Sequence, residues 1–356
     1  MPELSEPQHL WGDEKRDLTL EVSPSPSAAF VALLERTRFG TAGLRYRRLD
    51  VAGQLAALPR PLFVSLRRAD EIVGTYALAR MPIHTAAQTY EGIYRGALSV
   101  DEGSQGQGLG RFMVTRTLAW LGDVARDTGR TLISYGCIER TNERSLALLK
   151  SLGARQLGTL RTQLVYRQWP RAKVKLLRLD AQADPWVGDM QQAADADCAL
   201  RLGAQAKGSF FACSDGKGVA AAAFARLIRL DFDRIGQPWD ALYDYLLAHI
   251  GPARRRFDPH NFTYLKLDSP VVGNDDASMW PDFISTLMAE FGTHMAMITL
   301  DPARPAYRLL EQAGVFSGFS RATQQHLAVM ASSHGENPVP LARFAGERLA
   351  LHPIDL

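Results

Sequence analysis

The chain has 356 residues, of which 46% are hydrophobic, and a formal net charge of +3 at pH 7. This length exceeds one typical domain and suits two of about 150 to 180 residues. The near balance of charge, with no basic run interleaved with aromatic residues, argues against a nucleic-acid partner. Three cysteines without a C-x-x-C spacing and eight histidines without an H-x-x-x-H or H-x-H pair predict no metal site. The N-terminus has no leader pattern and there is no apolar run of about 18 residues, so we expect a cytoplasmic protein without a membrane span.

The first part of the chain has the pattern of a small sheet with one helix. Residues 1–16 are polar and are predicted to be a flexible N-terminus, and 17–22 are predicted to form a first strand. Ser25, with Pro26 at the first helical position, predicts the start of a helix that includes 28–36. A hairpin and a connection to the next strand are then predicted, over 61–67, 72–79 and 81–88.

The stretch Leu98–Gly110 predicts a strand, a glycine-rich loop and the start of a helix. Residues 94–100 are small, apolar or aromatic enough to pair in a sheet, and four glycines within the next ten residues end that strand. Beyond the loop the apolar residues recur with the helical period, so the helix should begin near Gly108. Such a helix directs free backbone N–H groups and the positive end of its dipole at the space in front of it. The stretch therefore predicts an anion site that suits a pyrophosphate.

Two common phosphate motifs do not fit this loop, because its spacing is G-x-G-x-G rather than G-x-G-x-x-G and no Gly-Lys-Ser/Thr follows. Gln105–Gly110, with Val100 five residues earlier, instead resembles the Q/R-x-x-G-x-G/A signature of the GNAT N-acetyltransferase superfamily. After a predicted strand over 131–139, Asn142–Ala154 resembles the family's N-x-x-A-x-x-L-Y-x-x-x-G-F segment in order and spacing. The resemblance covers about 17–168, and the alternative is a glycine turn that serves plain packing.

The second half of the chain repeats the first faintly, after a boundary around 168–173. Ala303–Gly314 keeps the small residue, the leucine and the glycine of Asn142–Gly153, which predicts an internal duplication. This copy has two adjacent aspartates, at 275 and 276, that would repel a phosphate, so it should not bind CoA there. Strands are predicted over 174–179, 209–214, 220–231, 262–267 and 294–300, and helices over 238–250, at the contact between domains, and 279–291. The tail from 338 to 356 is predicted to return as an edge strand on the first domain.

The resemblance implies an α/β (α+β) fold of two tandem GNAT-like domains, each with a mixed, mostly antiparallel sheet flanked by helices. The predicted division is a flexible N-terminus over 1–16, an acetyl-CoA-binding domain over 17–170 and a degenerate GNAT-like domain over 171–356. Acetyl-CoA is the implied co-substrate. Its pantetheine arm would lie along the strand that ends at Val100, and its pyrophosphate would meet the loop N–H groups. The implied cofactor-binding residues are Leu98, Ser99, Val100, Gln105, Gly106, Gln107, Gly108, Leu109, Gly110, Arg111 and Asn142, the last also a predicted helix N-cap.

The catalytic groups depart from the family pattern. The tyrosine that many members use as an acid falls at Leu149, and the position of the base glutamate in the loop-feeding strand falls at Tyr94. Glu91, three residues earlier, should face the opposite side of the strand from Tyr94. Tyr94 and Glu91 are the candidate catalytic residues, and the alternative for each is an ordinary strand residue with its polar tip in water. Tyr135 and Glu139 are further candidates, whereas Cys137 is predicted to be a small buried side chain.

The resemblance implies an enzyme, an acyltransferase that moves an acetyl group from acetyl-CoA to a primary amine of a small-molecule or peptide acceptor, as a monomer or homodimer. One alternative is a catalytically inactive acyl-CoA-binding regulatory or scaffolding protein, which Leu149 and the uncertain base favour. A third possibility is transfer of a longer acyl or an aminoacyl group. The intact glycine loop of the first copy counts against an aminoacyl-tRNA donor.

Overall fold

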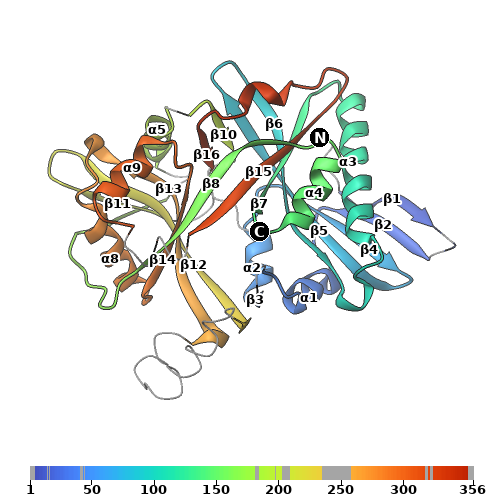
Figure 1. Cartoon of the computed structure of the whole chain (residues 1–356), viewed down its shortest axis with the longest axis horizontal. Helices are drawn as coiled ribbons and strands as arrows, with labels where there is room; N and C mark the ends of the chain where they lie inside the picture. The colour runs from blue at the N-terminus through green and yellow to red at the C-terminus, as the bar shows by residue number, and fades with distance from the viewer. Residues whose placement is uncertain are drawn as a thin grey trace.

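The computed structural model describes residues 5–351, apart from 14, 16, 41, 42, 44, 181–183, 197, 203–208, 235–257, 317–319 and 321–323. Within these residues, sixteen strands form one mixed, mostly antiparallel sheet with helices packed on its faces (Figure 1). The predicted α/β class is therefore confirmed. The helix predicted over 238–250 lies outside the described residues.

The first half contains an antiparallel run, β2-β4-β5-β6, to which β7 adds in parallel. The predicted hairpin is present, but its second strand continues to Thr85, so most of the connection predicted over 81–88 is strand. The first helix begins at Ala28 rather than at Pro26, because the Ser27 hydroxyl accepts the Phe30 N–H at 3.2 Å. The elements of this half are β1 (Gln8–Asp13), β2 (Leu18–Ser23), α1 (Ala28–Arg36), β3 (Arg45–Arg48), α2 (Val51–Ala56), β4 (Pro61–Arg68), β5 (Glu71–Thr85), β6 (Thr89–Val100), α3 (Leu109–Asp127), β7 (Leu132–Glu139), α4 (Glu143–Ser151) and β8 (Arg155–Tyr166).

The N-terminal segment contributes an edge strand. Gln8–Asp13, which the sequence analysis assigned to a flexible N-terminus, forms β1 and pairs antiparallel with β2. Trp11 packs against Phe112 of α3 with ring centroids 4.5 Å apart, and the Arg116 guanidinium lies 5.2 Å from the Trp11 ring centroid. The prediction was wrong for these residues because the segment is mostly polar, and the apolar contacts that hold it come from α3, which is distant in the sequence.

The second half repeats the order strand, helix, three strands, helix, strand, helix, strand of the first half, with a few added elements in each half, and its predicted strands and its helix near 279–291 are present. The tail also forms a strand, but it pairs with β10, which in turn pairs with β5 of the first half. The elements are β9 (Leu177–Asp180), α5 (Pro185–Ala194), β10 (Leu200–Leu202), β11 (Ser209–Ser214), β12 (Val219–Arg234), β13 (Phe262–Val272), α8 (Trp280–Glu290), β14 (Met295–Leu300), α9 (Pro305–Gln312), β15 (Gln325–His334) and β16 (Leu349–Leu351).

The two halves exchange their last strands at the centre of the sheet (Figure 1). The central part of the strand order is β7-β15-β8-β14, so β15 of the second half pairs with β7 and β8 of the first half pairs with β14. Outward from this centre the order is β6-β5-β4-β2 on one side and β13-β12-β11-β9 on the other. The order is therefore symmetric about β15 and β8, as an internal duplication would produce, and the sheet does not break at the predicted boundary near 170.

Alternate residues of the first-half strands pack into two separate cores. On one face, Phe30 and Leu33 of α1 pack in the same cluster as Tyr94 of β6. On the other face, Met113 of α3 packs in the same cluster as Ile93 of β6, and this cluster is called the α3-side core below. Helix α3 is thus fixed beneath β6, and its N-terminus lies where the glycine loop leaves that strand.

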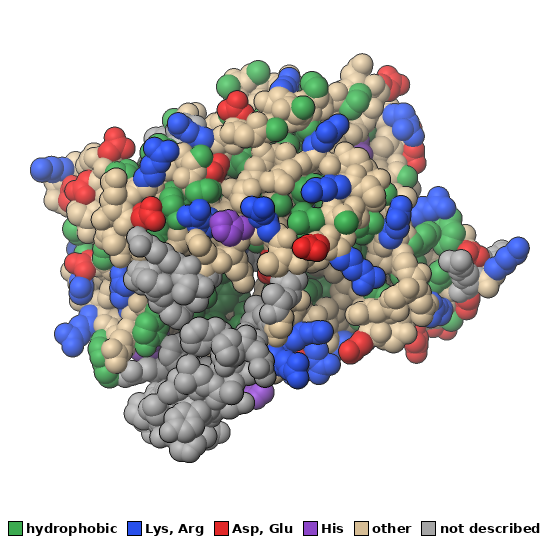
Figure 2. Space-filling model, in the orientation of Figure 1, with side chains coloured by type: hydrophobic (Ala, Val, Ile, Leu, Met, Phe, Trp, Pro, Cys, Tyr) green, Lys and Arg blue, Asp and Glu red, His purple; other side chains and the backbone are tan. Residues whose placement is uncertain are grey.

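The surface and the helices place few limits on the partner. Basic and acidic side chains are interspersed over the face shown in Figure 2. No helix in the described ranges is long and apolar enough to cross a membrane. Among the same residues, no three His, Cys, Asp or Glu side chains are grouped in a way that could hold a metal ion.

Candidate active site

The central feature of the site is a gap between β6 and β7. The two strands pair in parallel only from Glu91 and Leu132 to Tyr94 and Tyr135. Beyond that point β6 stays paired with β5 as far as Val100, and β7 stays paired with β15 as far as its last residue. Their outer edges are therefore held while their inner edges diverge, which leaves backbone N–H and C=O groups facing the gap.

The gap closes at Arg95 and Gly136. A Cβ atom on Gly136 would lie 2.9 Å from the backbone oxygen of Arg95, closer than real Cβ contacts allow. Gly136 therefore lets β7 approach β6 at the apex of the gap. The Arg95 side chain points away into the α3-side core, where its Nη2 donates to the Met330 carbonyl oxygen at 3.3 Å.

A bulge lies in β6 just past this apex. Ala97 has a left-handed φ of 49°, and the register of β5 against β6 shifts between Thr75 and Ala77. A residue with a Cβ in this region costs about 1–2 kcal/mol, so the surrounding sheet must impose the conformation. The bulge leaves one residue outside the ladder and turns its backbone toward the gap.

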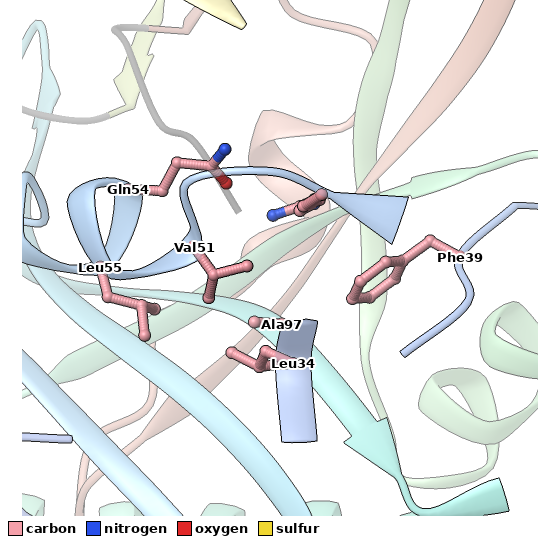
Figure 3. Close-up of a pocket in the computed structure, with 7 residues that line it drawn as sticks. Leu34, Phe39, Val51, Gln54, Leu55 and Ala97 are labelled. Atoms are coloured by element: carbon pink, nitrogen blue, oxygen red, sulfur yellow. The ribbon is translucent and has the colours of Figure 1, made fainter. Parts of the chain in front are cut away.

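A small cavity lies behind the bulge, between α1, α2 and β6 (Figure 3). Its volume is about 10 Å³, which is roughly the space needed by one water molecule. Its walls are mostly apolar, with polar groups at Arg48 and Gln54, and the other lining residues are Leu34, Phe39, Val51, Leu55 and Ala97.

The glycine loop follows β6 directly. Gly106 and Gly108 have φ of 79° and 76°, and a Cβ atom on either would meet nothing within 4 Å. These glycines are therefore needed for their backbone conformation, and they face open space. Helix α3 begins at Leu109, as predicted, with Gly108 as an N-cap that offers no side-chain acceptor. The first-turn N–H groups of α3 consequently remain available to an anion.

Side chains around the loop add positive charge. The Arg68 Nη2 donates to the Gln107 Oε1 at 2.8 Å, which holds a guanidinium beside the loop. The Gln105 side chain connects the loop to the end of β6, because its Nε2 donates to the Val100 carbonyl oxygen at 3.2 Å. Arg111, in the first turn of α3, is exposed. The loop therefore offers N–H donors and open space to an anion, and Arg68 adds a guanidinium beside it that was not predicted from the sequence.

The strand residues predicted to line the pantetheine arm would act through their backbone. Leu98 and Val100 pack against the α3-side core, and the Ser99 hydroxyl lies 2.5 Å from the Thr37 hydroxyl at the end of α1. Their side chains are thus engaged in packing. The backbone of the bulge and of the strand end is what faces β7 across the gap.

Asn142 and Leu149 occupy the positions that the sequence analysis gave them. Asn142 is the N-cap of α4, and its Oδ1 accepts the Ser145 N–H at 3.1 Å. This confirms the predicted capping role. Leu149 is 7% exposed and packs in the α3-side core, so α4 presents no proton donor at this position.

Two tyrosines lie at the last paired residues before the gap. Tyr94 is 4% exposed and Tyr135 is fully buried, and their rings pack edge to face with centroids 5.6 Å apart. The Tyr135 hydroxyl donates to the Met81 sulfur at 3.6 Å. Burial raises the pKa of Tyr135 well above its usual value, so its hydroxyl stays protonated.

Glu91 lies apart from the other predicted residues. As predicted, it faces the opposite side of β6 from Tyr94, because Ile93 packs with α3 and Tyr94 packs with α1. Its carboxylate lies 3.7 Å from the Arg130 guanidinium, just beyond the C-terminus of α3. The glycine loop is at the other end of this 19-residue helix, about 28 Å away at 1.5 Å per residue. The structure does not bring Glu91 to the gap.

Glu139 is the last residue of β7, at the end of the segment that no longer pairs with β6. By the period of two it shares a face with Tyr135 and Cys137, the face that α1 also covers. Burial raises the pKa of the Tyr46 hydroxyl in β3, and the Glu139 carboxylate adds to the increase. This carboxylate therefore lies near β3, on the side of the gap opposite α3.

The second half forms a wall on this side of the site. Residues 45–48 form β3, which pairs antiparallel with the end of β12. Arg38 and Arg47 form ion pairs with Asp233 and Asp231 of β12. His260 adds a contact between its Nδ1 and the Asp231 Oδ1 at 2.9 Å. β3 could not be predicted from the sequence, because its four residues, three of them arginine, carry no alternating apolar signal.

Cys137 is a protonated thiol at neutral pH. Burial raises the pKa of this thiol to about 12, and the ammonium of Lys266, from β13, opposes the increase. The thiolate that a nucleophile requires is therefore scarce. The side chain was predicted to be buried, and it is partly exposed.

The second copy keeps the gap and the bulge but not the glycine loop. Strands β13 and β14 pair only from Leu265 and Ala296 to Leu267 and Ile298, and Ser269 has the same left-handed φ of 49° as Ala97. The segment that follows carries two adjacent aspartates before α8, and the Asp276 carboxylate accepts from Ser278. Negative charge at this helix N-terminus disfavours a phosphate. In the first copy the adjacent acidic residues, Asp101 and Glu102, lie farther from the helix start and pair with Arg36 and Arg38.

Comparisons with known proteins agree with this geometry. Residues 29–154 match the acetyltransferase (GNAT) family. No curated protein matches the sequence. Two crystal structures of Saccharomyces cerevisiae N-myristoyltransferase with bound myristoyl-CoA are similar to this chain. Their identities are 10% and 9% and their TM-scores 0.53 and 0.54, over 93% of this chain and 83% and 80% of those chains. A GCN5-related N-acetyltransferase from Anabaena variabilis is 12% identical, with a TM-score of 0.49 over 88% of this chain and 72% of that one. At such identities the N-myristoyltransferase likeness shows a shared fold.

Proposed function

We propose, from the premise that this chain is an acyltransferase with a GNAT-family acetyltransferase domain at residues 29–154, that it transfers the acetyl group of acetyl-CoA to a primary amine. The observation that carries the proposal is the placement of an anion-binding loop at the mouth of a gap between two strands. The loop directs N–H groups outward at the start of α3, and the gap leads from there to a closed apex. A ligand with a pyrophosphate at one end and an extended polar arm at the other suits this arrangement.

The residues divide between the two parts of the donor. The N–H groups of residues 105–111 and the Arg68 guanidinium would hold the pyrophosphate. The backbone of residues 98–100 and the open edge of β7 would pair with the amides of the pantetheine arm, as a further strand would. The bulge at Ala97 would flank the arm near its reactive end, and the helix start at Asn142 would lie at the open end of the gap.

Transfer requires a neutral amine next to the thioester. The amine nitrogen attacks the thioester carbon, the new C–N bond forms, the C–S bond breaks, and the thiolate of CoA leaves. The amine gives up one proton and the thiolate takes one up. Tyr94 is our proposed donor to the thiolate, because it lies at the apex of the gap.

Glu139 is a better proposed base than Glu91. Its carboxylate is at the open end of β7, near β3, whereas Glu91 is paired with Arg130 at the far end of α3. The acceptor would approach from the side of β3 and β12, so both halves would shape its site. This supports a small-molecule or peptide amine as the acceptor.

The test is a calorimetric titration of acetyl-CoA into the protein and two matched variants, Gly108→Glu and Gly129→Glu. Both glycines have a left-handed φ with open space around the missing Cβ, so both substitutions cost a similar conformational strain. They lie at opposite ends of α3, and only Gly108→Glu puts a carboxylate where the pyrophosphate would lie. We expect binding by the parent and by Gly129→Glu, and none by Gly108→Glu.

Turnover then separates the enzyme from an acyl-CoA-binding protein without activity, which the buried Leu149 favours. Release of the CoA thiol would be followed with a panel of primary amines, with the Glu139→Gln variant beside the parent. A protein that binds acetyl-CoA but releases no thiol above the Gly108→Glu background with any amine would support the inactive alternative. Absence of binding by a folded parent would contradict the proposed function.

A further inference from the structure

The fold does not by itself set the length of the acyl group, because the similar N-myristoyltransferase structures hold myristoyl-CoA. Any limit on the length of the acyl group must therefore come from the side chains at the apex of the gap. If the proposed function holds, the pantetheine arm runs from the glycine loop toward the point where β6 and β7 meet. The thioester would then lie between the bulge at Ala97 and the last paired residues, Tyr94 and Tyr135.

One face of the apex is closed by aromatic rings. Tyr94 and Tyr135 project to the α1 side, are 4% and 0% exposed, and pack edge to face. Behind them Met81 contacts the Tyr135 hydroxyl and is itself 2% exposed. An acyl chain that continued beyond the thioester on this face would have to displace a ring from a packed core.

The other face is closed by the core under α3. Ile93 and Met113 are both fully buried there, and the Arg95 side chain is 5% exposed. The cavity beside Ala97 is also too small for a chain, since its volume of about 10 Å³ holds about one water or one methyl group. Between these boundaries, each methylene beyond an acetyl group would have to overpack a dense interior.

We propose that the Tyr94 and Tyr135 rings form a gate that restricts the donor to short acyl groups, acetyl above all, with Tyr135 the main determinant of chain length. Tyr135 has no part in the proposed chemistry. Its ring stands between the apex and the core, and its removal would extend the gap toward Met81.

The experiment measures kcat/KM for acetyl-, propionyl-, butyryl- and hexanoyl-CoA with the parent, Tyr135→Ala and Tyr135→Phe. We expect the parent to lose about 10-fold or more for each added methylene. Tyr135→Ala should raise the ratio of butyryl to acetyl transfer by about 10-fold or more. Tyr135→Phe keeps the ring and removes only the hydroxyl, so its chain-length profile should match that of the parent.

Two further variants keep the result interpretable. Leu34→Ala enlarges the cavity on the α1 side of Ala97, and it should leave the chain-length profile unchanged. Tyr135→Leu replaces Tyr135→Ala if the latter unfolds, since leucine is shorter than tyrosine but still fills much of the core. Folding is checked by thermal unfolding, and the affinity for free CoA is checked by calorimetry.

The outcomes separate the gate from the function on which it rests. No binding of CoA by the parent would remove the proposed function itself. Binding and acetyl transfer, with equal rates for hexanoyl-CoA, would leave the function standing and overturn the gate. A gain of long-chain transfer in Leu34→Ala, or an unchanged profile in a folded Tyr135→Ala, would show that the chain does not extend toward Tyr135.

Discussion

His334 gives a quantitative prediction for the pH dependence of stability. This residue ends β15, and its Nε2 lies 2.8 Å from the Ser134 hydroxyl. Burial, and secondly the positive charge of Arg95, lower the pKa of His334 from 6.5 to about 4. The folded state therefore disfavours the protonated imidazole, whereas the unfolded chain accepts the proton near pH 6.5.

The sign and the magnitude follow from this difference. Stability from a neutral His334 is fully present above pH 6.5 and is lost as the pH falls toward 4, because protonation then favours the unfolded chain. The gap between the two pKa values corresponds to about 3 kcal/mol in total at 1.36 kcal/mol for each pH unit. Between pH 7.5 and pH 5.0 the expected loss is about 2 kcal/mol.

The assay is urea unfolding at those two pH values, for the parent and for His334→Gln. Glutamine keeps a polar partner for Ser134 and does not titrate, so the parent should lose about 2 kcal/mol more than the variant on acidification. His9→Gln, at an exposed histidine of β1, is the control and should behave as the parent does. Equal losses in the parent and His334→Gln, within about 0.5 kcal/mol, would refute the reasoning.

Two further predictions concern the site. Arg68→Ala removes the guanidinium beside the glycine loop and should weaken acetyl-CoA binding about 3- to 10-fold in calorimetry, because one charge-assisted contact to the pyrophosphate is lost. Arg67→Ala, which removes a partner of Glu21, should leave the affinity within twofold of the parent, and an equal loss in both would argue against a specific role for Arg68. Cys137 should react with iodoacetamide at pH 8 far more slowly than a free thiol, since the pKa of its thiol is about 12. Mass spectrometry of the intact and digested protein would measure this, and rapid modification of Cys137 in the folded protein would contradict its protonated state.

The glycine loop could be predicted from the sequence because its determinants are local. Left-handed backbone at Gly106 and Gly108 and the start of a helix at Leu109 depend on residues within a few positions of one another. The capping role of Asn142 is local in the same way. That Tyr94 and Glu91 lie on opposite faces of the sheet could be predicted from the alternation of side chains along a strand. The fold class and the conformation of the glycine loop could be predicted for this reason.

The position of Glu91 illustrates the limit of such reasoning. Its face on the strand could be predicted, but its distance from the loop depends on the register of β6 against β7 and on the length of α3. Conversely, Arg68 lies 39 residues before Gln107 in the chain, and no spacing rule connects them. Tertiary packing places Glu91 far from the glycine loop and Arg68 beside it.

By itself, the sequence determined the elements that local periodicity, glycine and caps specify, and it indicated the duplication through a repeated segment. Only the tertiary structure decided which strands became neighbours. β8 and β15 exchange places at the centre of the sheet, and β3, whose arginine-rich sequence has no strand pattern, pairs with β12 across the halves. Pairing between distant strands depends on shape and burial summed over the whole sheet, a quantity that no short stretch of residues contains.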